Sequence, residues 1–310
     1  SIIYSAGQLQ PFFIAPAAHG RQPPGLHANQ LLLKSINLFF NLPERYNIMI
    51  SKYISRKANQ WQNLRNRRRV LIIEDLRVGY IPIYKVASTS LRNLFCRRQA
   101  KHILPKRAGR KLSVGEKRQV ENCIRKSVSV RQIRRLRRRY FLFAFVRNPV
   151  TRLYSCYLDK VVRAGRHGKQ NSMQRYGIRH DMNFENFARQ IARIPDQDSD
   201  RHFRSQHFQI YHQGRCLVDF VGNFENMAAH WQILSEKTGL EKPPGSYRHT
   251  GAGNRLKKLP LGLEAARLIS RRYSKDIDLL GYRQEIDQWL SWKAKQASEE
   301  NEIDKAGPMH

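Results

Sequence analysis

One cation and three hydroxyl residues stand where a predicted strand gives way to a predicted helix, within residues 81–91. Lys85 follows the β-prone run, and Ser88, Thr89 and Ser90 occupy the expected first helical turn. Such a turn has free backbone N–H groups and the positive end of the helix dipole, so this corner would bind an anion. The alternative from these residues alone is a Ser/Thr helix cap beside a surface lysine.

A second pair of potential anion-binding side chains, Arg147 and Ser155, is separated by eight positions. Arg147 follows residues 140–146, an apolar run without alternation that predicts a strand covered on both faces. Nucleotides bind at the carboxyl edge of parallel sheets. There a planar guanidinium can clamp a phosphate while the serine donates a hydroxyl. The alternative is that Arg147 pairs with a carboxylate and that Ser155 is only solvated.

The segments that would position these side chains alternate between β-prone and helical patterns. Asn148 and Pro149 supply a cap and a first-turn proline for a helix with an apolar stripe. The remaining expected elements are strands over 70–73, 78–83 and 216–221, helices over 30–40, 90–98, 225–236 and 262–273, and a basic loop over 163–183. Strands followed by helices predict an α/β protein with a parallel sheet flanked by helices. We expect an irregular extension over 1–65, one domain over 66–290 and a polar tail over 291–310.

Together these stretches resemble the nucleotide-binding elements of sulfotransferases that use 3′-phosphoadenosine 5′-phosphosulfate (PAPS). The likeness is strongest to the Golgi-type carbohydrate branch, the chondroitin, dermatan and HNK-1 group, and to bacterial relatives. In that family a Lys-centred loop after the first strand holds the 5′-phosphosulfate. An Arg in an R-N-P segment and a Ser eight residues later hold the 3′-phosphate. The resemblance implies a P-loop-like sulfotransferase fold in which PAPS is bound by Lys85, Val86, Ala87, Ser88, Thr89, Ser90, Arg147 and Ser155.

Three later segments also resemble parts of this family, namely 200–206, 219–226 and 273–282. The likeness then covers about residues 70–285. Three positions depart from the family's pattern, which commonly has Pro, Trp and Pro where this chain has Tyr84, Phe203 and Ser205. The first departure concerns the loop for the 5′-phosphosulfate, and the other two concern the acceptor side.

The resemblance implies in-line transfer of the sulfuryl group to a hydroxyl, and we expect a carbohydrate acceptor. Lys85 would neutralise the bridging oxygen of the departing phosphate. The acceptor hydroxyl needs a base, and His202 is the first candidate because imidazole titrates near neutral pH. Glu225 is the second candidate. The structural alternatives are a histidine that binds backbone or substrate, and a glutamate that caps a helix.

A P-loop kinase or NTPase shares this architecture, but its signature places two glycines ahead of Lys-Ser/Thr. Here only Gly79 precedes Lys85 in this stretch, and Val86 follows it. Sulfuryl transfer needs no metal ion, because the sulfuryl group carries less charge than a phosphoryl group. We therefore expect PAPS as co-substrate and no metal.

The formal net charge of +33, from 57 Lys and Arg against 24 Asp and Glu, predicts attraction to polyanions. The basic run over 131–139 is compatible with a solvated face, with an anionic polysaccharide acceptor or with nucleic acid. A basic nucleic-acid-binding protein is thus the main alternative function, although the sequence has no recognisable module such as a zinc finger or an RNA-recognition motif. The other alternative is a sulfotransferase-like protein that binds nucleotide without turnover.

The sequence has no apolar stretch long enough to cross a bilayer. We expect a cytoplasmic protein. The alternative is a membrane-anchored form with a lumenal catalytic domain, if a longer chain carries an anchor upstream.

Overall fold

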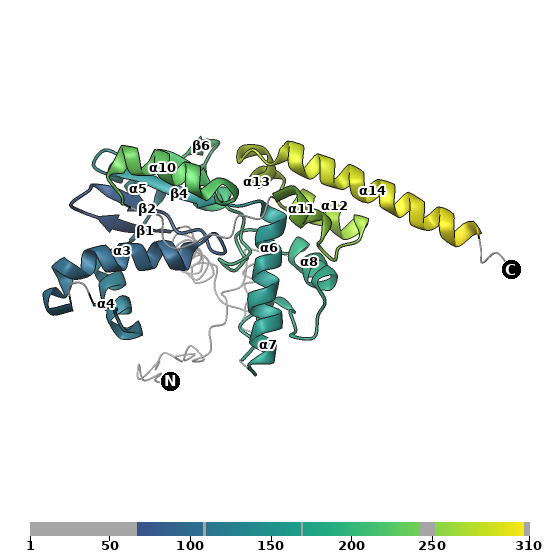
Figure 1. Cartoon of the computed structure of the whole chain (residues 1–310), viewed down its shortest axis with the longest axis horizontal. Helices are drawn as coiled ribbons and strands as arrows, with labels where there is room; N and C mark the ends of the chain where they lie inside the picture. Colours follow the sequence, from purple (N-terminus) through teal and green to yellow (C-terminus); the bar gives the residue numbers. More distant parts are fainter. Residues whose placement is uncertain (1–66, 108–109, 169, 242–251, 307–310) are drawn as a thin grey trace, which may run out of the picture. The chain divides into compact units, whose positions relative to one another are not determined.

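The computed structural model describes residues 67–107, 110–168, 170–241 and 252–306 (Figure 1). The extension expected over 1–65 and the helix expected over 30–40 lie outside the described residues. All described residues belong to one compact unit, Arg67–His310.

A five-stranded sheet in the order β3-β1-β2-β4-β7 lies at the centre of this unit. Its parallel part consists of β2 (Val78–Tyr80), β4 (Phe141–Val146) and β7 (Phe220–Asn223). β1 (Arg68–Ile73) and β3 (Arg125–Val128) extend one edge as antiparallel strands. The predicted α/β fold class is confirmed, and the strands that carry the site are parallel, whereas the antiparallel edge was not expected.

The helices differ in length from those expected, and they continue to the end of the described chain. The longer ones are α3 (Ser88–Ile103), α4 (Val114–Ile124), α6 (Pro149–Tyr157), α8 (Phe184–Ala192), α10 (Met227–Thr238), α12 (Leu263–Arg272) and α14 (Arg283–Ala306). The shorter ones are α5 (Val130–Leu136), α7 (Ala164–Arg166), α9 (His207–Ile210), α11 (Ala252–Lys257) and α13 (Ser274–Leu279), together with a π-helical turn, η2 (Leu158–Arg163), and the 3-10 turns η1 (Pro105–Arg107), η3 (Gln174–Tyr176) and η4 (Phe224–Asn226). Helix α14 therefore occupies residues 291–306 of the expected polar tail.

Two expected strands are shorter than their apolar runs. β2 ends at Tyr80, and the last ladder bond is donated by the Ile81 N–H to the Phe143 carbonyl at 2.9 Å. Pro82 has no N–H with which to continue the ladder. The run over 216–221 splits between β7 and a small hairpin, β5 (Tyr211–His212) with β6 (Arg215–Cys216).

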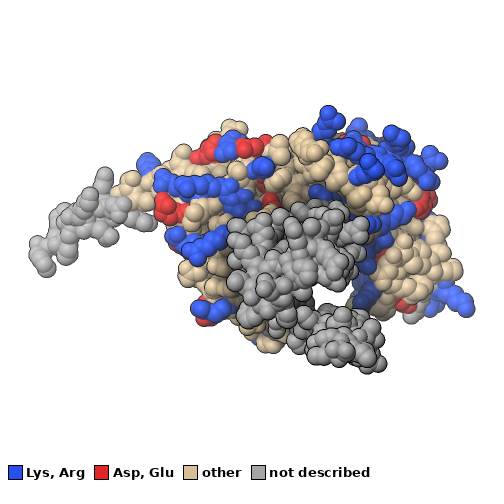
Figure 2. Space-filling model, turned by 180° about the vertical axis from the view of Figure 1, so that it is seen from behind, with Lys and Arg blue, Asp and Glu red and all other residues tan. Residues whose placement is uncertain are grey.

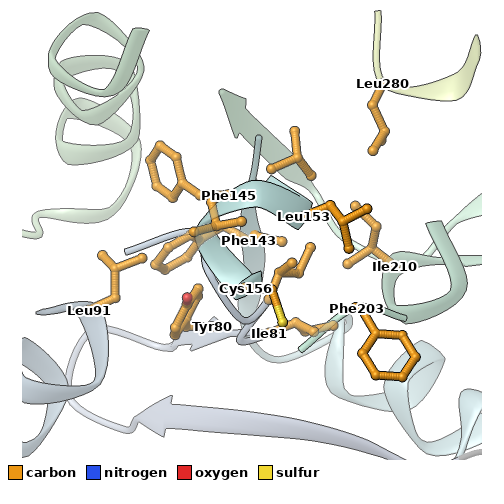
Figure 3. Close-up of a cluster of buried hydrophobic side chains, with 14 of the residues drawn as sticks. Tyr80, Ile81, Leu91, Phe143, Phe145, Leu153, Cys156, Phe203, Ile210 and Leu280 are labelled. Carbon is orange, nitrogen blue, oxygen red and sulfur yellow. The ribbon is translucent and has the colours of Figure 1, made fainter. Parts of the chain in front are cut away.

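Aromatic residues of the parallel strands form the centre of the core. Tyr80 and Phe143 are register partners, and their rings stack at 5.2 Å. Figure 3 shows Phe143 and Phe145 in the middle of the cluster, between Leu91 of α3 and Leu153 of α6. Burial of these side chains supplies hydrophobic free energy that holds β2 and β4 together.

β7 approaches β4 closely because of one glycine. Gly222 pairs with Phe145, and a Cβ on Gly222 would lie 2.3 Å from the Phe145 ring. Trp231 of α10 stacks on the same ring at 6.1 Å. The close fit brings the segment after β7, which contains Glu225, next to the end of β4. None of the helices in the described ranges is both long and apolar enough to span a membrane.

Candidate active site

The loop between β2 and α3 has the backbone of an anion-binding corner. Lys85 and Ala87 have positive φ angles of +67° and +49°, and Val86 between them is fully buried. Non-glycine residues adopt positive φ angles at a cost in free energy. Alternation of left-handed and right-handed backbone conformations points successive N–H groups into one concave site. The first intrahelical bond runs from the Leu91 N–H to the Ala87 carbonyl at 3.1 Å. The N–H groups of residues 88–90 therefore precede the helix ladder and face the corner.

The predicted side chains of this corner have different exposures. Ser88 is buried, Ser90 is half-buried and Thr89 is exposed. The Lys85 ammonium lies 3.2 Å from the Asp159 carboxylate of η2. Burial acts to raise the pKa of Asp159, but the charges of Lys85 and its neighbours outweigh burial and lower that pKa. The sequence reading missed Asp159, and no motif marks it.

The second corner lies at the carboxyl end of β4. Asn148 caps α6 as predicted, because its side-chain oxygen accepts bonds from the N–H groups of Val150 and Thr151 at 3.0 and 3.2 Å. Arg147 Nε donates to Thr151 Oγ1 at 3.1 Å, and its guanidinium lies 5.0 Å from the centre of the Phe224 ring. These contacts hold the guanidinium in place at the corner.

Arg147 forms no ion pair with a carboxylate among the residues that the structure describes. Burial lowers its pKa to about 10, so the guanidinium keeps its charge at neutral pH. Its Nη1 lies 3.5 Å from the main-chain oxygen of Lys85. The two predicted corners, which are 62 positions apart in sequence, therefore touch each other. Ser155 is half-buried on α6, and within the described part of the chain its hydroxyl has no hydrogen-bond partner.

His202 forms a dyad with an aspartate. Its Nδ1 lies 2.5 Å from Asp200 Oδ1, and the His202 N–H donates to the same oxygen at 2.9 Å. Burial acts to raise the pKa of Asp200, but the bond to His202 lowers it to about 2. A carboxylate can only accept, so Nδ1 is the donor and Nε2 of the neutral ring is the acceptor. Burial lowers the pKa of His202 more than Asp200 raises it.

The buried Arg152 connects this dyad to the Lys85 loop. Its side chain is 1% exposed, and Nη1 donates to the carbonyls of Tyr84 at 3.2 Å and of His202 at 3.3 Å. Nη2 donates to the Arg204 carbonyl. The Tyr84 and His202 rings are in edge contact at 4.9 Å. Sequence reasoning missed Arg152, because this residue lies off the apolar stripe of the helix and its burial is known only from the structure.

Glu225 anchors the second corner. Its Oε1 accepts from the Asn148 N–H at 2.8 Å, and its Oε2 accepts from the Tyr282 hydroxyl at 3.0 Å. The side chain of Gln206 holds the main chain of Arg147, the residue before Asn148. It accepts from the Arg147 N–H at 3.0 Å and donates to the Arg147 carbonyl at 2.6 Å. Both carboxylate oxygens of Glu225 are thus engaged in positioning the corner.

The three later family-like segments meet at this point. Asp276 is fully buried, and it accepts from the N–H groups of Gln206 and His207, both at 2.8 Å. The Tyr273 hydroxyl donates to the Phe203 carbonyl at 2.5 Å. Segment 273–282 therefore supports segment 200–206, which carries the dyad. No group of three or more His, Cys, Asp or Glu side chains within the described ranges is arranged to hold a metal ion.

The fold and this site define a class: an α/β protein with two touching strand-to-helix corners at the carboxyl edge of parallel strands, where proteins of this architecture bind nucleotides. The model of the sulfotransferase family matches residues 68–283. The chain belongs to the sulfotransferase family, and the predicted sulfuryl-transfer class of enzyme is confirmed at that level. Comparisons with curated proteins and with solved structures returned no match.

Proposed function

We propose that the protein transfers the sulfuryl group of PAPS to a hydroxyl of a carbohydrate. The observation that carries this proposal is the contact between the two corners, with Arg147 Nη1 at 3.5 Å from the Lys85 carbonyl. A nucleotide with one anionic group on each side of its ribose can engage both corners only if they share one crevice. Two unrelated cavities would have excluded it.

The residues present fit the two ends of PAPS. The corner over 85–90 offers an ammonium, hydroxyls and free N–H groups for the phosphosulfate. Arg147 offers a guanidinium that carries no carboxylate partner in the described part of the chain, which suits the 3′-phosphate. Ser155, about two turns along α6, would add a hydroxyl at that end.

The transfer forms a bond between the acceptor oxygen and sulfur while the bond from sulfur to the phosphate oxygen breaks. The products are the sulfate ester and 3′-phosphoadenosine 5′-phosphate, and the hydroxyl proton passes to a base. Lys85 and the N–H groups of the corner would offset the charge that develops on the leaving phosphate oxygen. When Lys85 binds that oxygen, its ion pair with Asp159 would break or weaken.

Of the two candidate bases, the geometry favours His202. Its Nδ1 is occupied by Asp200, its lowered pKa keeps Nε2 free of a proton at neutral pH, and Tyr84 places the ring beside the Lys85 loop. Glu225 uses both oxygens to hold Asn148 and Tyr282, so we assign it a positioning role in this proposal.

Calorimetry with 3′-phosphoadenosine 5′-phosphate tests the nucleotide site. We expect binding by the wild type, and binding about 10- to 100-fold weaker in Arg147→Ala because a charged hydrogen-bonding partner of a phosphate is lost. Arg134→Ala removes an exposed arginine of α5 and serves as the matched control. Absence of binding by the wild type would refute the proposal.

Transfer of ³⁵S from labelled PAPS to a panel of glycans tests turnover. Label on a glycan supports the carbohydrate acceptor, and Lys85→Ala should reduce the rate on the order of 10²–10³-fold. Nucleotide binding without label on any glycan would instead favour a sulfotransferase-like protein that binds nucleotide without turnover.

An exposed basic surface favours a second candidate function, the binding of nucleic acid. Figure 2 shows Lys and Arg side chains over the visible face, gathered most densely at its upper right, where the turned view places α5. The arginines of the 131–139 run are exposed there, although Arg137 is engaged with Asp219 at 2.7 Å. This function predicts binding to any DNA duplex that weakens steeply with salt and is unchanged in Arg147→Ala.

A further inference from the structure

A basic cavity of about 580 Å³ lies between α3 and α4, next to the Lys85 loop. Its volume lies within the range of ligand pockets, roughly 300–1,000 Å³. We call it the α3–α4 cavity, and its lining consists of Arg69, Tyr84, Thr89, Arg92, Asn93, Cys96, Val114, Lys117, Arg118, Glu121, Asn122, Arg125 and Arg201.

The charge of the lining is strongly one-sided, because six cations face a single carboxylate. That carboxylate, Glu121, is already shared by Arg92 at 2.5 Å and Arg125 at 3.9 Å. Lys117 and Arg118 form no ion pair with any residue in the described part of the chain. Cations gathered in a concave site with little compensating charge attract anions, and they do so more strongly than on an open surface.

Tyr84 and Thr89 join this cavity to the active site. The Tyr84 hydroxyl accepts from Arg69 at 3.2 Å, the Arg201 guanidinium lies 4.7 Å from the centre of its ring, and His202 meets the ring at 4.9 Å. Thr89 lines the cavity and also belongs to the first turn after Lys85. A ligand can therefore extend from the sulfuryl-transfer site into the cavity.

The lining favours an acidic saccharide over nucleic acid. The amides of Asn93 and Asn122 suit sugar hydroxyls, and the exposed Val114 offers an apolar surface for sugar C–H groups. Single-stranded nucleic acids need aromatic platforms for their bases. Tyr84 is the one aromatic ring in this lining, and Arg201 already covers one of its faces.

We propose that the α3–α4 cavity binds negatively charged groups of the carbohydrate acceptor, so that acceptors with carboxylate or sulfate groups are used in preference to neutral ones. The proposal rests on the proposed sulfuryl transfer to carbohydrate. Lys117 and Arg118 are the cations free to meet those groups, and Tyr84 connects the cavity with His202.

The test compares two double variants that remove equal charge. Lys117→Ala with Arg118→Ala changes the cavity, and Lys237→Ala with Arg271→Ala changes exposed positions of α10 and α12. The acceptors are unsulfated chondroitin, which carries a carboxylate in each disaccharide, and its carboxyl-reduced neutral form. Transfer of ³⁵S gives KM and kcat, and calorimetry measures binding of 3′-phosphoadenosine 5′-phosphate and of chondroitin oligosaccharides.

We expect the cavity variant to raise KM for chondroitin about ten-fold or more and to weaken oligosaccharide binding equally, with nucleotide binding as in the wild type. The control variant should match the wild type on chondroitin. Equal KM values in the two variants, or a wild type that uses the neutral polymer as well as chondroitin, would overturn the proposal. Loss of oligosaccharide binding in the cavity variant without any turnover by the wild type would support the cavity and refute the transfer function instead.

Discussion

Replacement of Arg152 by methionine removes the buried group that joins the Lys85 loop to the Asp200–His202 dyad. The guanidinium donates to the carbonyls of Tyr84 and His202 through one nitrogen, and to that of Arg204 through the other. Methionine fills a similar volume but donates nothing, so three main-chain oxygens lose this donor.

The expected loss of stability follows from these three bonds. A hydrogen bond from a charged donor contributes about 1.5–3 kcal/mol, and burial of a cation costs free energy that methionine recovers in part. We therefore expect the free energy of unfolding to fall by about 3–5 kcal/mol, which is large against the roughly 5–15 kcal/mol typical of domains. Arg152→Lys should lose less, because its ammonium keeps the charge but cannot span both nitrogens' partners.

Urea denaturation of the full chain measures this change in the free energy of unfolding, and ³⁵S transfer measures its effect on catalysis. Because the loop and the dyad would no longer share a donor, we expect kcat to fall more than nucleotide affinity does. Arg267→Met is the matched control, since Arg267 is 46% exposed in its pair with Glu264 and should cost at most about 1 kcal/mol. An Arg152→Met protein with the wild-type urea midpoint and kcat would refute the reasoning.

Three further outcomes follow from the same geometry. Asp200→Asn removes the charge that raises the pKa of His202, so the acid limb of the kcat/KM profile, which already lies below the free value of about 6.5, should move to lower pH. The plateau of kcat/KM should fall on the order of 10²–10⁴-fold, and an unmoved limb would exclude His202 as the base. Asp159→Asn frees the Lys85 ammonium, and calorimetry should show nucleotide binding several-fold tighter, about 1 kcal/mol, whereas weaker binding would contradict the competition between them. Gly79→Ala places a Cβ 2.4 Å from a buried leucine methyl of β4, and urea denaturation should show a loss of roughly 1–3 kcal/mol; an unchanged midpoint would mean that the strand can shift.

Where the decisive interactions are local, the sequence predicted the structure well. The cap formed by Asn148 ahead of Pro149 and the buried strand before Arg147 depend on neighbours within a few residues. Local signals were also present for α4 and α5, because Ser113 with Glu116, and Ser129 with Gln132, form capping boxes. These signals would have predicted two helices in the basic stretch after α3.

The α3–α4 cavity could not be inferred in this way, because its cations come from four separate places along the chain. Arg69 lies on β1, Arg92 on α3, Lys117 on α4 and Arg201 beside the dyad. These cations contribute to the net charge of +33, but a net charge does not show where in the fold the charges lie. Only packing of α4 against α3 made a concave site from them.

The sequence alone predicted the two corners, their order along the chain and the family to which they belong, because each corner is encoded by residues within nine consecutive positions. The tertiary structure alone decided that the corners touch and that Arg152 bridges the loop and the dyad. Those contacts run to main-chain oxygens 50 to 68 positions away. Every residue has the same main-chain carbonyl, whatever its side chain. The residue type therefore does not indicate which carbonyl will be a partner, and only the folded structure identifies it.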